Sequence, residues 1–181
     1  MHKFAYLFLC FKKHKFTLFI NNNMYLRQKA IDYAYEFWNK RNPKFYNFDS
    51  LGGDCTNFIS QCLYYGSIPM DYSPNGWYYV SLSKRSSSFS GVNEFFNYAI
   101  TNTKSVGIKA KVVTIDKLEV GDVVQMLQKG DVFHHTLIIT KITGKVAELN
   151  NIYVTCHTND AKDKQLSNYY FKKIRFLKII S

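Results

Sequence analysis

One cysteine in this chain is placed where a thiol could act as a nucleophile. Cys55 follows residues 52–54, two glycines and an acid, and precedes apolar side chains at helical spacing, namely Phe58, Ile59, Cys62 and Leu63. This order predicts a helix that starts near Cys55 and stops near Gly66. Unpaired N–H groups and the helix dipole favour an anion in the first turn. We therefore expect a lowered thiol pKa at Cys55, which makes it the nucleophile, and an ordinary buried cysteine at Cys62.

A cysteine nucleophile needs a base, and three histidines lie in later segments that look like strands. His134 and His135 stand in a run of β-branched and aromatic residues, and His157 ends another such run. Consecutive strand residues point to opposite faces, so only one of the adjacent pair can face the Cys55 helix. His157, at a strand end, could orient a second imidazole. An ordinary polar role for each histidine is the alternative.

Eight segments carry a wider pattern, at residues 34–39, 42–45, 52–62, 66–70, 76–79, 121–125, 135–140 and 157–160. In type and order they resemble the bacterial putative amidase domain family, which is similar to the papain-like cell-wall hydrolases of the NlpC and CHAP type. The resemblance covers about six-sevenths of the chain. It implies a cysteine-dependent amidase or peptidase, with peptidoglycan stem peptides or a related amide as substrate and with neither cofactor nor metal.

The resemblance also implies roles for particular residues. Cys55 would be the nucleophile, and His135 would be the base because a small hydroxyl residue follows it, as in the family. A third polar group on the following strand would fix the imidazole ring. His157 matches that position best, and Asn159 and Asp160 are its rivals.

Other residues are expected to support the site. Asp54 is expected to cap the nucleophile helix by accepting a backbone N–H bond. The backbone N–H of Cys55 would help to hold an oxyanion. An aromatic substrate groove is expected from Trp77, Tyr78, Tyr79 and Phe89. Phe89 stands where the family commonly has tryptophan, and it lacks the indole N–H donor.

Three other functions use the same residues or the same fold. An acyltransferase would need only a different acceptor for the acyl group on the cysteine. A non-catalytic cell-wall binding module would need neither Cys55 nor His135, and both are present. A zinc site could use Cys156, His157, Asp160 and either His134 or His135, although their spacing matches no zinc motif.

Composition limits the class of protein. A chain of 181 residues can hold one domain with a sizeable core, and its four cysteines follow no disulfide pattern. The net charge of +11 could attract an anionic cell-wall polymer or acidic phospholipid, or could simply favour solubility. No helix or ribbon carries interleaved basic and aromatic residues for reading bases, so we expect no nucleic acid as partner. The protein is expected to be a monomer. Basic residues gather near both ends: Lys3, Lys12, Lys13, Lys15, Lys172, Lys173, Arg175 and Lys178.

Residues 1–23 match nothing in the family pattern. Their apolar run at 4–11 is shorter than the ~20 residues that span a bilayer, and no small-residue cleavage site follows it. A true start at Met24 is the favoured explanation, and a basic membrane anchor is the alternative. We therefore expect one domain over residues 24–181, and the location stays open between cell envelope, secretion and cytoplasm.

The order of the elements predicts an α+β fold. Helical spacing covers residues 25–41, the segment after Cys55, and residues 92–100, while the serine-rich residues 81–91 are expected to form a surface loop. Strands are predicted at 111–115, 122–128, 133–142, 146–157 and 170–179. Helices followed by strands favour an antiparallel sheet covered by the helices, as in papain-like hydrolases.

Overall fold

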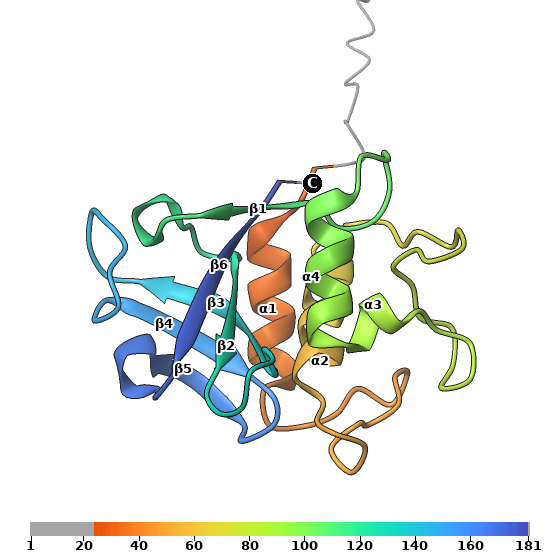
Figure 1. The fold of residues 1–181 in the computed structure, drawn as a ribbon, viewed down its shortest axis with the longest axis horizontal. Coiled ribbons are helices and arrows are strands. Elements are labelled where there is room, and N and C mark those ends of the chain that lie inside the picture. Colours follow the sequence, from red (N-terminus) through yellow and green to blue (C-terminus); the bar gives the residue numbers. More distant parts are fainter. Residues whose placement is uncertain (1–23, 181) are drawn as a thin grey trace, which may run out of the picture.

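The helices come first in the chain and the strands follow, as the computed structural model shows for residues 24–180 (Figure 1). In this part of the chain the α-helices are α1 (Arg27–Phe37), α2 (Cys55–Tyr65), α3 (Ser87–Ser90) and α4 (Val92–Thr101). The strands are β1 (Ala110–Val113), β2 (Val123–Leu127), β3 (His135–Ile142), β4 (Ile152–Cys156), β5 (Ala161–Gln165) and β6 (Lys173–Ile179). Two 3-10 helices, η1 (Ile115–Lys117) and η2 (Leu166–Asn168), precede β2 and β6.

All the strands join one antiparallel sheet in the order β1-β6-β2-β3-β4-β5. The helices α1, α2 and α4 cover one face of this sheet (Figure 1). On β2, Gln125 lies opposite Thr136 of β3 and Arg175 of β6. The expected α+β class with an antiparallel sheet is confirmed.

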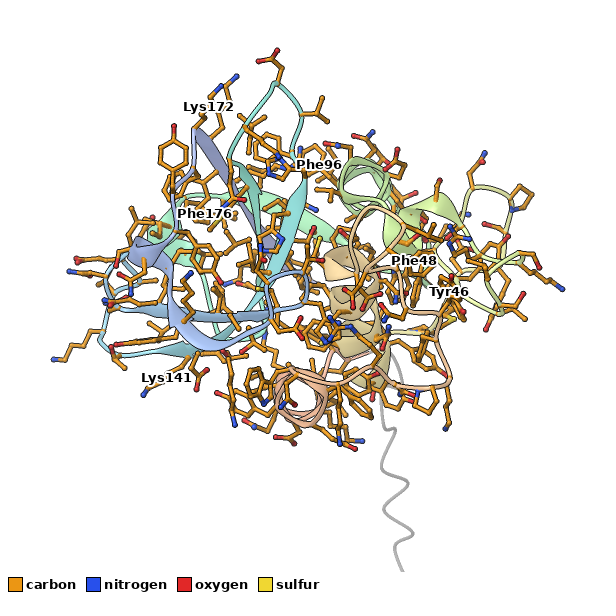
Figure 2. All side chains as sticks on the ribbon, turned by 90° about the horizontal axis from the view of Figure 1, so that it is seen from below. Tyr46, Phe48, Phe96, Lys141, Lys172 and Phe176 are labelled. Atoms are coloured by element: carbon orange, nitrogen blue, oxygen red, sulfur yellow. The ribbon has the colours of Figure 1, made fainter. Side chains whose placement is uncertain are left out.

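Two apolar clusters lie on opposite faces of the sheet. Between helices and sheet, the predicted stripe of Phe58, Ile59, Cys62 and Leu63 is fully buried. The second cluster, on the other face, includes Leu137, Ile139 and Cys156. Because side chains alternate along β3, Thr136 and Ile138 face α2 whereas Leu137 and Ile139 face away. Figure 2 shows side chains filling the space on both sides of the sheet, with Lys141 and Lys172 at the periphery.

Three expectations about local structure need correction. The serine-rich segment 81–91 contains the short helix α3, in which Ser88 and Phe89 are buried. The strand predicted at 146–157 begins only at Ile152, because a turn precedes it in which the Asn151 amide donates to the Val146 carbonyl. The strand β5 was not predicted, because it lies at the sheet edge and its sequence, Ala-Lys-Asp-Lys-Gln, carries no apolar alternation.

The remaining expectations concern the N-terminus and membranes. No helix within residues 24–180 is long and apolar enough to cross a membrane. The extension at residues 1–23, with its basic cluster, lies outside the described residues.

Candidate active site

Cys55 is the first residue of α2, as its sequence position predicts. Gly52 and Gly53 precede it with φ angles of +97° and +110°, a left-handed conformation that glycine adopts without strain. At Gly53 a Cβ would come within 2.9 Å of Thr158 Oγ1. The same hydroxyl accepts the backbone N–H of Asp54 at 2.8 Å. The double glycine therefore lets the chain turn sharply into α2 against the loop that follows β4.

The thiol of Cys55 borders an open hollow of about 430 Å³. Its residue is only 5% exposed, so a small part of the side chain meets this space. The glycine turn, the start of α4 and the residues before β3 surround it. Besides Cys55, the lining includes Phe48, Leu51, Gly52, Gly53, Arg85, Ser87, Ser90, Gly91, Val92, Asn93, Glu94, Phe133 and His134.

Burial decides the protonation state of Cys55. It raises the pKa of the thiol, although hydrogen bonds from the Thr136 backbone and from Thr56 oppose the rise. The Sγ atom lies 3.9 Å from the His134 carbonyl oxygen, which can accept the S–H, and 3.8 Å from Thr56 Oγ1. The expected lowering of the Cys55 pKa by the helix start is thus outweighed by desolvation. The resting group is a neutral thiol.

His135 opens β3 and lines a neighbouring hollow of about 370 Å³. Its ring centroid is 6.4 Å from that of Tyr169, on the sheet face turned away from α2. Burial lowers the His135 pKa to about 4, and electrostatic interactions with His134 and Lys164 add to the lowering. In residues 24–180 neither ring nitrogen of His135 has a hydrogen-bond partner. His135 is therefore a neutral imidazole with a free lone pair.

The Cys55 and His135 hollows adjoin, because Gly52 and His134 line both of them. No hydrogen bond joins the two side chains in the described part of the chain. Cys156 indicates that Cys55 and the His135 region are close together. Burial raises the pKa of the Cys156 thiol to about 12, and the nearby Cys55 thiol adds to the rise. The Cys156 Sγ lies 3.6 Å from the Tyr169 hydroxyl. Cys55 thus lies at the end of the sheet, beside the cluster that also contacts the His135 ring.

His157 does not take the expected place beside His135. Its Nδ1 lies 2.6 Å from Asp54 Oδ2, and its Nε2 donates to the Phe37 carbonyl at 2.7 Å. The ring also stacks on Phe58, with centroids 3.7 Å apart, and is 1% exposed. Both nitrogens are occupied, so His157 cannot orient the base. The reason is strand alternation: Cys156 points to one face of the sheet and His157 to the other.

Of the other expected supporting residues, Asp54 and Asp160 make structural contacts, and Asn159 lines the His135 hollow. Asp54 holds the N-cap position of α2 but makes no side-chain bond to the helix N–H groups, contrary to expectation. Its Oδ1 accepts instead from the Phe48 backbone and from the Asn57 amide. Asp160 forms a bidentate ion pair with Arg41, with N···O distances of 2.8 and 2.9 Å. Asn159 remains, and it lines the His135 hollow.

The predicted aromatic groove is core. Trp77 and Phe89 are fully buried, and Tyr79 is nearly so, within the cluster between helices and sheet. The Trp77 indole donates to Ser60 Oγ at 3.0 Å. Tyr78 is half-buried and packs on Tyr72, and it does not line the Cys55 hollow. The sequence did not reveal four residues that line the Cys55 hollow, because they come from segments without a recognisable motif. They are Arg85, Asn93, Glu94 and Phe133.

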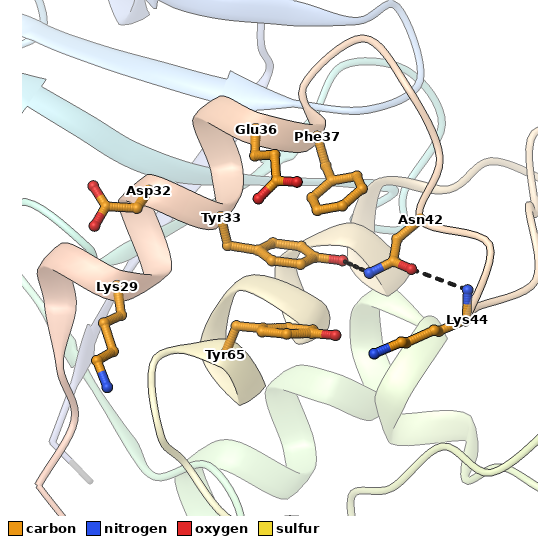
Figure 3. A pocket seen from close by; sticks show the side chains of 8 residues that line it. All are labelled: Lys29, Asp32, Tyr33, Glu36, Phe37, Asn42, Lys44 and Tyr65. Atoms are coloured by element: carbon orange, nitrogen blue, oxygen red, sulfur yellow. Dashed lines mark hydrogen bonds between the residues drawn. The ribbon is translucent and has the colours of Figure 1, made fainter.

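Another hollow, of about 450 Å³, lies beside α1 and contains none of the predicted catalytic residues (Figure 3). Tyr33 and Tyr65 stack there with centroids 4.3 Å apart. The Tyr33 hydroxyl donates to Gln61 and accepts from the Asn42 amide, which holds the ring in place. The lining of this hollow includes two lysines and two acidic residues, so their formal charges cancel.

The residues of the zinc alternative do not assemble. No group of three or more His, Cys, Asp or Glu side chains is placed to hold a metal ion within residues 24–180. Cys156 and His157 point to opposite sheet faces, and Asp160 is held by Arg41.

Comparisons with known proteins found a matching family model and a relative. A family model described as "Putative amidase domain" matches residues 24–180. The chain is also 38% identical over 132 residues to "Uncharacterized protein YhbB" of Bacillus subtilis (strain 168), a match covering 70% of this chain and 40% of that protein. No solved structure matches the chain significantly. Because the family model spans nearly the whole described chain, the protein belongs to the putative amidase domain family.

Proposed function

We propose that this chain is a cysteine-dependent amide hydrolase with Cys55 as nucleophile and His135 as base. The observation that carries the proposal is the placement of a thiol at the start of α2, in an open hollow that adjoins a neutral, unpartnered imidazole. The family match to an amidase domain supports cleavage of a C–N bond. The helix-on-sheet layout is compatible with a papain-like arrangement, which we include in the proposal.

The chemistry proceeds in two halves. His135 takes the thiol proton as Cys55 Sγ attacks the amide carbonyl, so no free thiolate is needed beforehand. The backbone N–H of Cys55, in the first turn of α2, stabilises the oxyanion. His135 then gives the proton to the departing amine, which leaves an acyl-thioester. Water, deprotonated by His135, releases the acid and restores the thiol.

His135 is unprotonated at neutral pH, because burial lowers its pKa to about 4, so its lone pair is open to a proton. Hydrogen bonds between catalytic groups often tighten only when substrate is bound, so the separation of Cys55 and His135 is compatible with the mechanism. Asn159, in the His135 hollow, is the proposed third residue in place of His157.

The proposed substrate is a stem peptide of peptidoglycan or a related amide, cleaved by a monomer. Exposed Lys172 and Lys173, at the start of β6, are available to an anionic cell-wall polymer. Two other basic residues of the C-terminal cluster donate hydrogen bonds to side chains of the protein itself. Arg175 donates to Gln125 and Lys178 to Glu119.

Digestion of purified peptidoglycan and soluble stem peptides by the full chain tests the proposal. Mass spectrometry should show new amine and carboxylate ends with the wild type and none with Cys55→Ala or after iodoacetamide treatment. A chelator should leave the rate unchanged, because a thiol–imidazole pair needs no metal. Activity lost to a chelator and restored by zinc would overturn the nucleophile assignment.

A further inference from the structure

The hollow that holds Cys55 also holds an arginine without an acidic partner. The Arg85 guanidinium lies over the Phe48 ring, 4.7 Å from its centroid. Its Nε donates to Ser90 Oγ at 3.2 Å, and its Nη1 donates to the Leu82 carbonyl. These contacts hold the guanidinium at the wall of the hollow. Among residues 24–180 no carboxylate comes within 4.0 Å of it, and its Nη2 has no acceptor.

The other arginines of the described chain are engaged elsewhere. Arg27 pairs with Asp122 at 2.7 Å, and Arg41 pairs with Asp49 and Asp160. The Arg175 guanidinium lies against the rings of Phe96 and Phe133, at 3.6 and 4.1 Å from their centroids, and does not line the Cys55 hollow. Arg85 is thus the arginine that combines a fixed position in this hollow with uncommitted N–H donors.

We propose that Arg85 binds a carboxylate of the substrate, so that the site selects amides that lie beside a free carboxylate. A guanidinium whose plane is already fixed can present its free Nη2–H donors to a carboxylate oxygen, which gives a charge-assisted hydrogen bond. Phe48 and Ser90 hold that plane before substrate arrives, which reduces the ordering needed on binding. The inference rests on the proposed function and names the substrate class for it.

Glu94 sharpens the selectivity. It lines the same hollow in the first turn of α4, and a Cβ placed on Gly91 would come within 2.2 Å of its carboxylate. A substrate carboxylate near Glu94 would be repelled, and the same group near Arg85 would be attracted. The two side chains together favour one orientation of an acidic peptide in the hollow.

Peptides with a γ-linked glutamyl residue have this chemistry, because chain growth through the side chain leaves the α-carboxylate free. The test therefore uses a matched pair: N-acetyl-L-alanyl-γ-D-glutamyl-L-lysinamide, and the same peptide with the glutamyl α-carboxylate as a carboxamide, so that the glutamyl α-carboxylate is the one free carboxylate of the pair. The two differ in one charged group and hardly in size. The full chain is assayed with Arg85→Gln, Arg85→Lys and the control Lys84→Gln, which changes an exposed neighbour outside the hollow.

We expect wild type to prefer the carboxylate peptide by about ten- to a hundredfold in kcat/KM, as for a hydrogen-bonded charge pair. Arg85→Gln should remove this preference, so that the ratio of kcat/KM for the carboxylate peptide to kcat/KM for the carboxamide peptide falls to near one. Arg85→Lys should keep part of the preference, and Lys84→Gln all of it. An equal loss for both peptides, or no preference in wild type, would overturn the inference.

Binding to the inactive Cys55→Ala variant separates this inference from the proposed function. Calorimetry should show tighter binding of the carboxylate peptide, and Cys55→Ala with Arg85→Gln should lose the difference. If wild type cleaves neither peptide but binding keeps this Arg85 dependence, the hydrolase proposal fails and the carboxylate subsite stands. If cleavage occurs without preference, or binding shows no Arg85 dependence, the subsite fails.

Discussion

His157 and Asp54 form a buried side-chain pair at 2.6 Å that joins the end of β4 to the start of α2. The Phe37 carbonyl can only accept, so His157 Nε2 carries a hydrogen and donates to it. Arg41 Nε stands 3.7 Å from Asp54 Oδ2, the oxygen paired with His157. The pair therefore connects α1, α2 and β4 at the point from which Cys55 projects.

Breaking this pair should destabilise the fold. His157→Gln leaves the Asp54 carboxylate buried without its partner, and we expect a loss of roughly 3–5 kcal/mol in the free energy of unfolding. Urea denaturation measures it. The control Asp160→Asn breaks an exposed ion pair with Arg41 and should cost at most about 1 kcal/mol. A stable His157→Gln protein whose kcat collapses would instead return His157 to an orienting role.

Among the three cysteines of residues 24–180, alkylation should identify Cys55 as the accessible thiol. It lines a hollow, whereas Cys62 and Cys156 are fully buried, so iodoacetamide should modify Cys55 before these two. Because burial raises the Cys55 pKa, the rate should still climb above the ordinary thiol midpoint of about 8.5. Peptide mapping by mass spectrometry across pH measures both. Prior labelling of Cys62 or Cys156, or a rate already constant at pH 7, would contradict the expectation.

The two adjacent histidines should differ in their effect on turnover. We expect His135→Ala to lower kcat/KM by roughly 10²–10⁴-fold, the usual contribution of a positioned base. His134→Ala should stay within a few-fold, because that side chain is exposed and its ring bonds only to the Val132 carbonyl. Steady-state kinetics on one stem peptide compares them. The opposite ranking would assign the base to His134, whose ring also lines the Cys55 hollow.

His135 should make stability depend on pH. Its pKa is about 4 in the folded state and 6.5 in the ordinary state, so the unfolded chain binds the extra proton between these values. The stabilising contribution is complete above pH 6.5 and is lost as pH falls toward 4. The difference of 2.5 pKa units corresponds to roughly 3 kcal/mol at 1.36 kcal/mol per unit. Urea denaturation at pH 7.5 and 4.5 should show a smaller fall for His135→Asn; equal falls would exclude this residue as the cause.

Trp77 should affect stability and leave substrate affinity alone. Trp77→Ala opens a cavity in the main core, and we expect a loss of roughly 3–5 kcal/mol in the free energy of unfolding. Trp77→Phe should cost less, because the phenyl ring fills most of the cavity. The remaining cost comes mainly from the indole N–H donor that Ser60 Oγ loses. The exposed Tyr170→Ala is the control. A folded Trp77→Phe protein with an unchanged KM supports the core role, and a large rise in KM would restore the aromatic groove.

The local sequence determined where the Cys55 helix begins. Apolar spacing after Cys55, the glycine pair before it and Gly66 at its end are all short-range signals, and α2 runs from Cys55 to Tyr65. The order of helices and strands likewise predicted the α+β class. By contrast β5 was missed, because a polar edge strand is defined by its pairing with β4 and not by its own hydrophobicity.

The tertiary structure alone decided what surrounds each candidate residue. Hydrophobicity cannot distinguish a groove wall from a core, so Trp77 and Phe89 were placed at the substrate and lie in the interior. Alternation predicts that neighbours on a strand diverge, but which face His157 takes depends on how β4 docks on α2. The Cys55 pKa follows the same logic. A helix start lowers it locally, whereas the packing that desolvates the thiol is long-range and outweighs that effect.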